Sequence, residues 1–193
     1  AVKKEPVKNI KEEKVVIEAK ILNEICKILS ETEDEEDVIF KISDKRAQVI
    51  LSNTEISIRL LEGEFIKYKD IIPKEFKTRL VVSCSDLLSS IERASLLAKE
   101  GKNNLIKFSI ENNNIEITSR SEEGNVKENV SIDQSGEDIV IGFNSKYVID
   151  VLKNCGDDEI AFEMNSAVSA CLVKPTEGED YIYMILPVRI SAS

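Results

Sequence analysis

The sequence repeats one order of secondary structure three times, and this repeat limits the folds open to the chain. Each repeat begins with a short apolar strand, continues with a helix that has one apolar face, and ends with three short strands. The helices are predicted around residues 21–29, 87–95 and 147–152. Corresponding residues Ile21, Leu87 and Tyr147 follow one another after 66 and then 60 residues, so the chain contains three copies of one supersecondary unit.

The predicted strands are short runs of apolar and β-branched residues separated by turn residues such as those at 112–114. They cover residues 15–17, 38–42, 47–51, 54–60, 79–83, 105–110, 115–120, 126–132, 139–143, 159–164, 167–174 and 181–186. Strands outnumber helices, and each helix has a single apolar stripe. We therefore expect an α+β fold in which antiparallel sheets lie outside and the helices pack together on one inner face.

Composition argues against several classes of function. The chain has a formal charge of −10, no histidine, and only seven glycines, which form no phosphate-binding loop. Without histidine it lacks the commonest general base and metal ligand. No apolar run approaches the roughly 20 residues that span a bilayer, and no signal peptide is visible. We expect a cytoplasmic protein with no membrane partner, no catalytic residue, no metal and no cofactor.

Two groups of residues invite a metal-site interpretation and do not support it well. The cysteines are far apart and form no C-x-x-C pair, so reduced and mostly buried thiols are expected at Cys26, Cys84, Cys155 and Cys171. The acidic run 31–37 lacks the ligand spacing and central glycine of a calcium-binding loop, which favours a solvated turn. A metal-dependent hydrolase that uses Glu33, Asp34 and Asp37 is kept as a rival hypothesis that metal titration would test.

The last stretch, residues 181–190, is apolar and aromatic and reads as a strand that ends at a proline. Pro187 cannot donate a ladder hydrogen bond, so the final residues are expected to leave the edge of the sheet. This predicts that Leu186, Val188 and Ile190 are available to a partner.

Basic residues lie along the polar faces of the predicted helices. Lys20 and Lys27 are seven residues apart, Lys146 and Lys153 are seven apart, and the middle helix offers Arg93. A solvated face held by charge pairs between neighbouring turns explains this pattern simply. The sharper hypothesis is that three helices side by side present these cations to a phosphate backbone, without reading bases.

Five stretches, which together reach over nearly the whole chain, form a recognisable set. They are Leu61-Glu62-Gly63-Glu64-Phe65-Ile66-Lys67-Tyr68, Ile71-Ile72-Pro73, Glu92-Arg93-Ala94, the run from Ile141 to Leu152, and Leu186-Pro187-Val188-Arg189-Ile190. In these stretches the chain resembles one family, the bacterial DNA polymerase III beta subunit, or sliding clamp. In that family each domain holds two such repeats and each protomer holds three domains. Two protomers form a ring whose helices surround duplex DNA.

The resemblance implies the DNA-clamp fold and the following domains: residues 1–72 as the second half of the middle domain with its linker, 73–190 as the C-terminal domain, and 191–193 as a tail. Ala1 then resembles a truncation point. The implied function is a non-catalytic processivity factor that binds duplex DNA without sequence specificity. The implied partners are the replicative polymerase, the clamp loader and repair proteins, which dock through short linear motifs, and the full-length protein is a homodimer.

The resemblance also implies particular site residues. The peptide-binding pocket is expected from Ile66, Asp70, Ile71, Ala167, Ser169, Met184, Leu186, Pro187, Val188 and Arg189. The DNA-facing residues are expected to be Lys20, Lys27, Arg93, Lys146 and Lys153, and the ring interface to include Leu96 and Leu97. The family commonly has proline where this chain has Ile66 and a basic residue where it has Asp70. A protein-interaction module unrelated to DNA remains the alternative, since the acidic net charge allows it.

Overall fold

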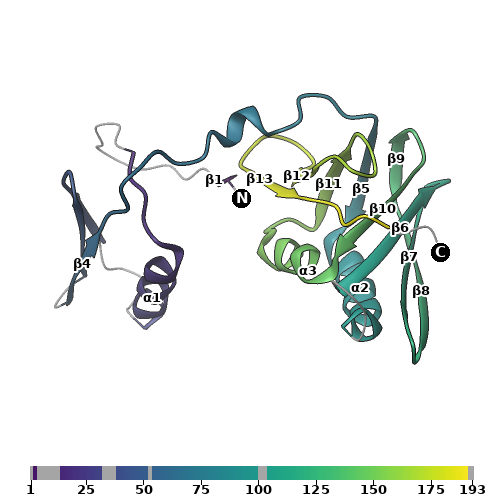
Figure 1. Ribbon diagram of the computed structural model, residues 1–193, viewed down its shortest axis with the longest axis horizontal. Helices are drawn as coiled ribbons and strands as arrows, with labels where there is room; N and C mark the ends of the chain where they lie inside the picture. The colour runs from purple at the N-terminus through teal and green to yellow at the C-terminus, as the bar shows by residue number, and fades with distance from the viewer. Residues whose placement is uncertain (1, 4–13, 32–37, 52–53, 100–103, 191–193) are drawn as a thin grey trace. The chain divides into compact units, whose positions relative to one another are not determined.

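The computed structural model describes residues 2–3, 14–31, 38–51, 54–99 and 104–190, and it divides into two compact units. The N-terminal unit consists of residues 7–68, and the C-terminal unit of residues 1–6 and 69–193. The 3₁₀ turn η1 (Tyr68–Asp70) contains the boundary between them. Figure 1 shows the elements of each unit.

The N-terminal unit is one copy of the repeat. Helix α1 (Ala19–Ser30) is followed by β2 (Ile39–Ile42), β3 (Arg46–Leu51) and β4 (Thr54–Arg59), which form an antiparallel sheet in that order. The core joins Ile25 of the helix to alternate residues of β3, because every second side chain of a strand points to the same face. The predicted strand at 15–17 is absent: these residues form an irregular segment whose Val16 carbonyl accepts a hydrogen bond from the Leu61 amide.

The C-terminal unit contains the two remaining repeats. The first consists of β5 (Thr78–Ser83), α2 (Cys84–Ala98), β6 (Leu105–Glu111), β7 (Asn114–Ser121) and β8 (Gly124–Ser131). The second consists of β10 (Ile139–Asn144), α3 (Ser145–Asn154), β11 (Glu159–Met164), β12 (Cys171–Pro175) and β13 (Tyr181–Ile185). Two short strands that the sequence pattern did not predict, β1 (Val2–Lys3) and β9 (Asp133–Gly136), complete the unit.

The two repeats exchange their first strands. One antiparallel sheet has the order β1-β13-β12-β11-β5-β9, so β5 of the first repeat pairs with β11 of the second. The other sheet has the order β10-β6-β7-β8, so β10 of the second repeat pairs with β6 of the first. Both sheets are antiparallel, which confirms the predicted fold class.

Helices α2 and α3 pack against each other, and their apolar faces share one core with both sheets (Figure 1). Each helix begins at a side-chain cap, because an oxygen of Ser83 or Asn144 accepts a hydrogen bond from a first-turn amide. In the core, the rings of Phe108 and Phe143 meet edge to face with centroids 5.4 Å apart. Helix α1 belongs to the other unit, so the expectation that all three helices share one face stays a prediction.

Candidate functional site

The last described segment, residues 186–190 and called the tail from here on, leaves one sheet and lies on the other. Strand β13 ends at Ile185, as Pro187 predicted. Three residues further on, the Val188 amide donates a hydrogen bond of 2.8 Å to the carbonyl oxygen of Gly142 on β10. The tail therefore leaves its own sheet as expected, but it is attached to the edge strand of the four-stranded sheet.

A glycine at position 142 permits this contact. A Cβ atom built there would lie 2.7 Å from the Val188 carbonyl oxygen, 2.9 Å from Cγ1 of Ile190 and 3.0 Å from Cδ1 of Leu105. Atoms at such distances overlap, so any larger residue would push the tail away. The exposed part of the tail is thereby held against a buried strand.

The tail presents some predicted pocket residues to solvent and partly covers others. Leu186 is 66% exposed, and Arg189 is exposed as well, which agrees with the prediction for Leu186. Val188 is half-buried and its amide is hydrogen-bonded, so its availability to a partner stays a prediction. Pro187 and Met184 are also half-buried, and Met184 pairs directly with Leu172 on β12.

The loop before β12 is fixed by a serine turn instead of continuing the strand. The predicted strand 167–174 begins only at Cys171, because Ser166 forms a turn with Ser169. The hydroxyl oxygens of the two serines are 2.6 Å apart, and the Ser169 amide donates a hydrogen bond to the Ser166 hydroxyl. The turn leaves Ala167 exposed and Ser169 half-buried. The remaining predicted pocket residues lie near the boundary of the units: Ile66 is exposed in the N-terminal unit, and Asp70 and Ile71 are exposed in the C-terminal unit.

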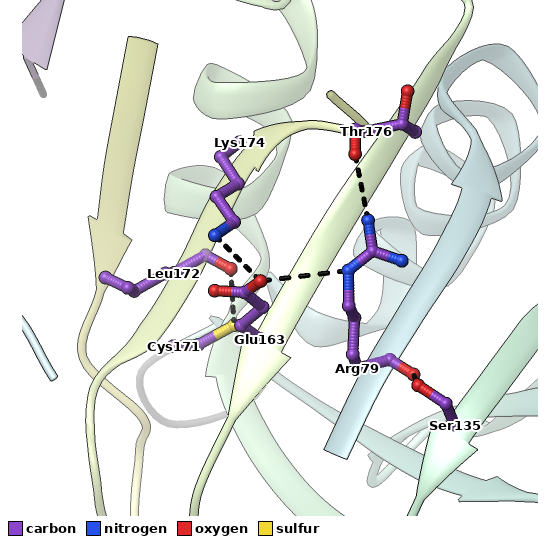
Figure 2. A network of polar contacts seen from close by, with 7 residues as sticks. All are labelled: Arg79, Ser135, Glu163, Cys171, Leu172, Lys174 and Thr176. Carbon is purple, nitrogen blue, oxygen red and sulfur yellow. Dashed lines mark hydrogen bonds and ion pairs between the residues drawn. The ribbon is translucent and has the colours of Figure 1, made fainter. Parts of the chain in front are cut away.

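Sequence reasoning missed a pocket of about 280 Å³ that lies within the C-terminal unit. The segment 72–76 forms one wall, and side chains of β11, β12 and β13 form the other. The buried charged residue of its lining is Glu163, only 6% exposed, whose carboxylate lies 2.8 Å from Nζ of Lys174 and 3.7 Å from Nε of Arg79 (Figure 2). A glutamate in the otherwise apolar run 160–164 was the available signal.

Tyr147 was also assigned incorrectly. The repeat made it the counterpart of the apolar helix residues Ile21 and Leu87, but its side chain is 60% exposed in the first turn of α3. Helix α3 follows β10 directly, and β10 is the strand on which the tail lies. The helix buries Val148, Val151 and Leu152 instead.

Most of the predicted DNA-facing cations are engaged in ion pairs. Arg93 on α2 donates two hydrogen bonds to Glu128 on β8, of 3.0 and 2.7 Å, and this pairing lowers the pKa of Glu128. Lys153 on α3 lies 2.8 Å from Glu92 on α2, which links the two helices. In the N-terminal unit Lys27 lies 2.8 Å from Glu24. For Lys20 and Lys146, no ion-pair partner is present among the described residues.

The predicted ring-interface residues lie at the C-terminal end of α2. Leu96 is 64% exposed, whereas Leu97 is half-buried and approaches Gly124 at the start of β8. Strand β8 is the last strand of its sheet, so its outer edge has no partner strand among the described residues. An exposed leucine beside an unpaired edge is a surface that can extend a sheet into another chain.

The thiols offer no activated nucleophile. Cys84 and Cys171 are buried, and burial raises the pKa of both. Burial also raises the pKa of Cys155 to about 11. Cys26 is exposed, contrary to the expectation for that residue.

The rival metal site falls on residues 33, 34 and 37, which lie outside the described residues. Within the described residues, no cluster of three or more cysteine, aspartate or glutamate side chains could hold a metal ion. No helix in the described part of the chain is long and apolar enough to cross a membrane.

Comparison with solved structures identifies the class of protein to which this fold belongs. The DNA polymerase III beta subunit of Thermotoga maritima superposes with a TM-score of 0.88 at 31% identity, over 97% of this chain and 51% of that chain. The DNA polymerase sliding clamp of Bacillus subtilis superposes with a TM-score of 0.85 at 35% identity, over 92% of this chain and 47% of that one. The fold is that of bacterial sliding clamps.

The sequence comparisons identify the family. The family model for the DNA polymerase III beta subunit, C-terminal domain, matches residues 69–189. The beta sliding clamp of Staphylococcus aureus is 35% identical over 192 residues, which cover 98% of this chain and 50% of that protein. The chain belongs to the DNA polymerase III beta-subunit family, and it spans about half the length of the curated relatives that it matches.

Proposed function

We propose that this chain is part of a sliding clamp, a non-catalytic processivity factor for the replicative DNA polymerase. The observation that carries the proposal is the family match over residues 69–189. Relatives that match nearly the whole of this chain are named beta sliding clamps, and the repeated strand-helix-strand architecture is the one found in their solved structures. Such a protein works on chromosomal DNA and therefore acts in the cytoplasm.

The proposed docking surface for partner proteins is built around the tail. Leu186 offers an exposed apolar side chain, and the contact between Val188 and Gly142 holds its backbone in place. Met184 and the turn at 166–169 are the neighbouring parts that the prediction included, and Asp70 and Ile71 of the same unit are proposed to complete the surface. A short extended peptide with large apolar side chains suits such a wall, because burial of apolar area supplies the affinity at about 25 cal/mol per Å². Polymerase, clamp loader and repair proteins are the proposed partners.

The proposed mode of DNA binding is encirclement rather than strong surface attraction. Arg93, Lys153 and Lys27 already share their charges with glutamates, and the chain has a net charge of −10. These are surface ion pairs, which contribute little to the stability of the protein. Phosphates can therefore replace the carboxylates at a small cost in free energy. Closure of the ring is proposed to use Leu96, Leu97 and the open edge of β8 in a homodimer of the full-length protein.

Peptide titration of isotopically labelled protein tests the docking surface. A peptide with one glutamine and two or three large apolar residues is expected to bind at about 0.1 to 1 mM, equivalent to about 4 to 5.5 kcal/mol. Its chemical-shift changes should cluster at Met184 to Arg189 and at residues 167–169. Leu186→Asp should abolish binding, because the peptide would have to bury a charge. Leu96→Asp is the matched control, with nearly equal exposure on α2.

Changes spread over the helix faces, or equal losses in both variants, would exclude the tail as the docking surface. A polarisation assay with duplex DNA tests the second part of the proposal. The 193-residue chain should bind weakly at most, and a rise in salt should weaken the binding further. Submicromolar binding that resists salt would contradict DNA retention by encirclement.

A further inference from the structure

The pocket beneath residues 72–76 has the size and lining of a site for a side chain. Its apolar walls are Ile72, Pro73 and Phe76 on one side and Met164, Leu172 and Ile182 on the other. Its volume of about 280 Å³ falls just below the roughly 300 to 1,000 Å³ typical of small-molecule sites. Phe76 is 47% exposed, which leaves an aromatic face open to a visiting group. One or two large side chains fit such a space better than a cofactor does.

The buried ion-pair group at the pocket holds one carboxylate beside two cations. The Glu163 carboxylate is shared by two cations, Lys174 at 2.8 Å and Arg79 at 3.7 Å, and Arg79 also donates to the carbonyl oxygen of Thr176 (Figure 2). Lys174 lines the pocket with only 26% of its side chain exposed. The other charged lining residues, Lys74, Glu75 and Glu179, are exposed, so water screens them more strongly. Over the whole lining three glutamates stand against two lysines, so an entering carboxylate would meet a surplus of positive charge only beside Lys174.

The pocket is continuous with the docking surface around the tail. Leu172 of the pocket and Met184 of the docking surface are direct cross-strand partners, and such partners point to the same face of a sheet. Ile182 lies two residues before Met184 on the same strand, a distance of about 7 Å. Two or three residues of extended peptide span this distance, at roughly 3.3 Å each.

We propose that this pocket is a second subsite of the docking surface, which takes a large apolar side chain of a partner peptide while a neighbouring carboxylate of that peptide pairs with Lys174. The proposal rests on the proposed docking function. The subsite would distinguish among partners that share the same core motif, because only those with the apolar-acidic flank would fill it. Selectivity of this kind comes from a difference in affinity at a site that all partners share.

Four peptides and three variants test the subsite in the 193-residue chain. The core peptide is extended by Ala-Leu-Asp at its N-terminus or at its C-terminus, and each extension has a control, Ala-Ser-Asn, at the same end. We expect one Ala-Leu-Asp extension to bind about 3- to 10-fold more tightly than its control. Phe76→Ala should remove most of this gain, and Lys174→Gln should reduce it, whereas both should leave the affinity of the control peptides unchanged. Leu186→Asp should abolish binding of all four peptides.

The outcomes separate the subsite from the docking surface as a whole. If the control peptides bind at the tail but neither extension gains affinity, or if the gain persists in both pocket variants, the subsite is refuted and the docking surface stands. If no peptide binds the parent protein, both proposals fail. Thermal unfolding of each variant verifies folding, and Phe76→Ala provides a test that does not disturb the buried Glu163, because Phe76 takes no part in that ion-pair network.

Discussion

Replacement of Gly142 by alanine tests whether the tail is held by close approach to β10. The added Cβ would lie 2.7 Å from the Val188 carbonyl oxygen, and ordinary contact begins at 3.4 Å, so the tail has to retreat by about 0.7 Å. The same movement would lengthen the hydrogen bond between the Val188 amide and the Gly142 oxygen from 2.8 Å to about 3.5 Å. A hydrogen bond of that length contributes little.

Two effects determine how far Gly142→Ala lowers the free energy of unfolding. Loss of one backbone hydrogen bond costs about 0.5 to 1.5 kcal/mol, and overpacking of a close contact costs about 1 to 3 kcal/mol unless the tail detaches and relieves it. We therefore expect Gly142→Ala to lower the free energy of unfolding of the C-terminal unit by about 1 to 3 kcal/mol. Urea denaturation followed by circular dichroism measures this change, and amide exchange reports the Val188 hydrogen bond directly. Exchange of that amide should become faster.

Gly156→Ala is the matched control. Gly156 is exposed, and among the described residues a Cβ atom added there would meet nothing within 4 Å beyond its own chain neighbours. Alanine there should be neutral or should stabilise by up to about 1 kcal/mol, through reduced freedom of the unfolded chain. Equal stability of the two variants, with unchanged exchange at Val188, would refute the assignment of the tail to β10.

Three further predictions concern charged and titratable groups. Glu163→Gln should destabilise the C-terminal unit by about 1 to 3 kcal/mol, because its two partly buried cations lose their counter-charge; an unchanged melting temperature would contradict this. In an NMR titration, Arg93→Gln should return the lowered pKa of Glu128 toward its ordinary value. Because that folded-state pKa is lowered, the stabilisation by the pair is complete above the ordinary pKa of glutamate and is lost as the pH falls through the folded value. Finally, iodoacetamide at pH 8 should modify Cys26 first, and the rate at Cys155 should keep rising up to a pH of about 11; equal rates at pH 8 would be inconsistent with the burial of Cys155.

Local patterns in the sequence predicted most of the secondary structure, because the signals lie within a few residues of each other. The helix predicted around 147–152 and the strand at 105–110 are examples, and both are confirmed. The local pattern failed in two places. At Ser166, hydrogen bonds of the hydroxyl group turn the chain where a strand was predicted. In α3, the helix buries Val148 instead of Tyr147, whose side chain is exposed.

The sequence predicted which residues belong to the candidate site, which stays a prediction, but it did not predict how they are arranged. The motif around Leu186 indicated which residues to examine, but the tail reaches β10 through one hydrogen bond between positions 46 residues apart. Nothing near Val188 in the sequence specifies Gly142 as its partner. The pocket around Glu163 depends in the same way on the segment 72–76, which lies about 90 residues earlier in the chain.

The exchange of first strands between the two repeats of the C-terminal unit has a kinetic consequence. Leu80 pairs with Phe162, so a loop of 82 residues has to close before β5 finds its place between β9 and β11. Pairings so distant in sequence raise the contact order, which slows folding. A cut between the repeats would leave each half without the strand that completes its sheet. The unit should therefore fold in one cooperative step whose transition state contains both repeats, and neither repeat should persist as an independently stable intermediate.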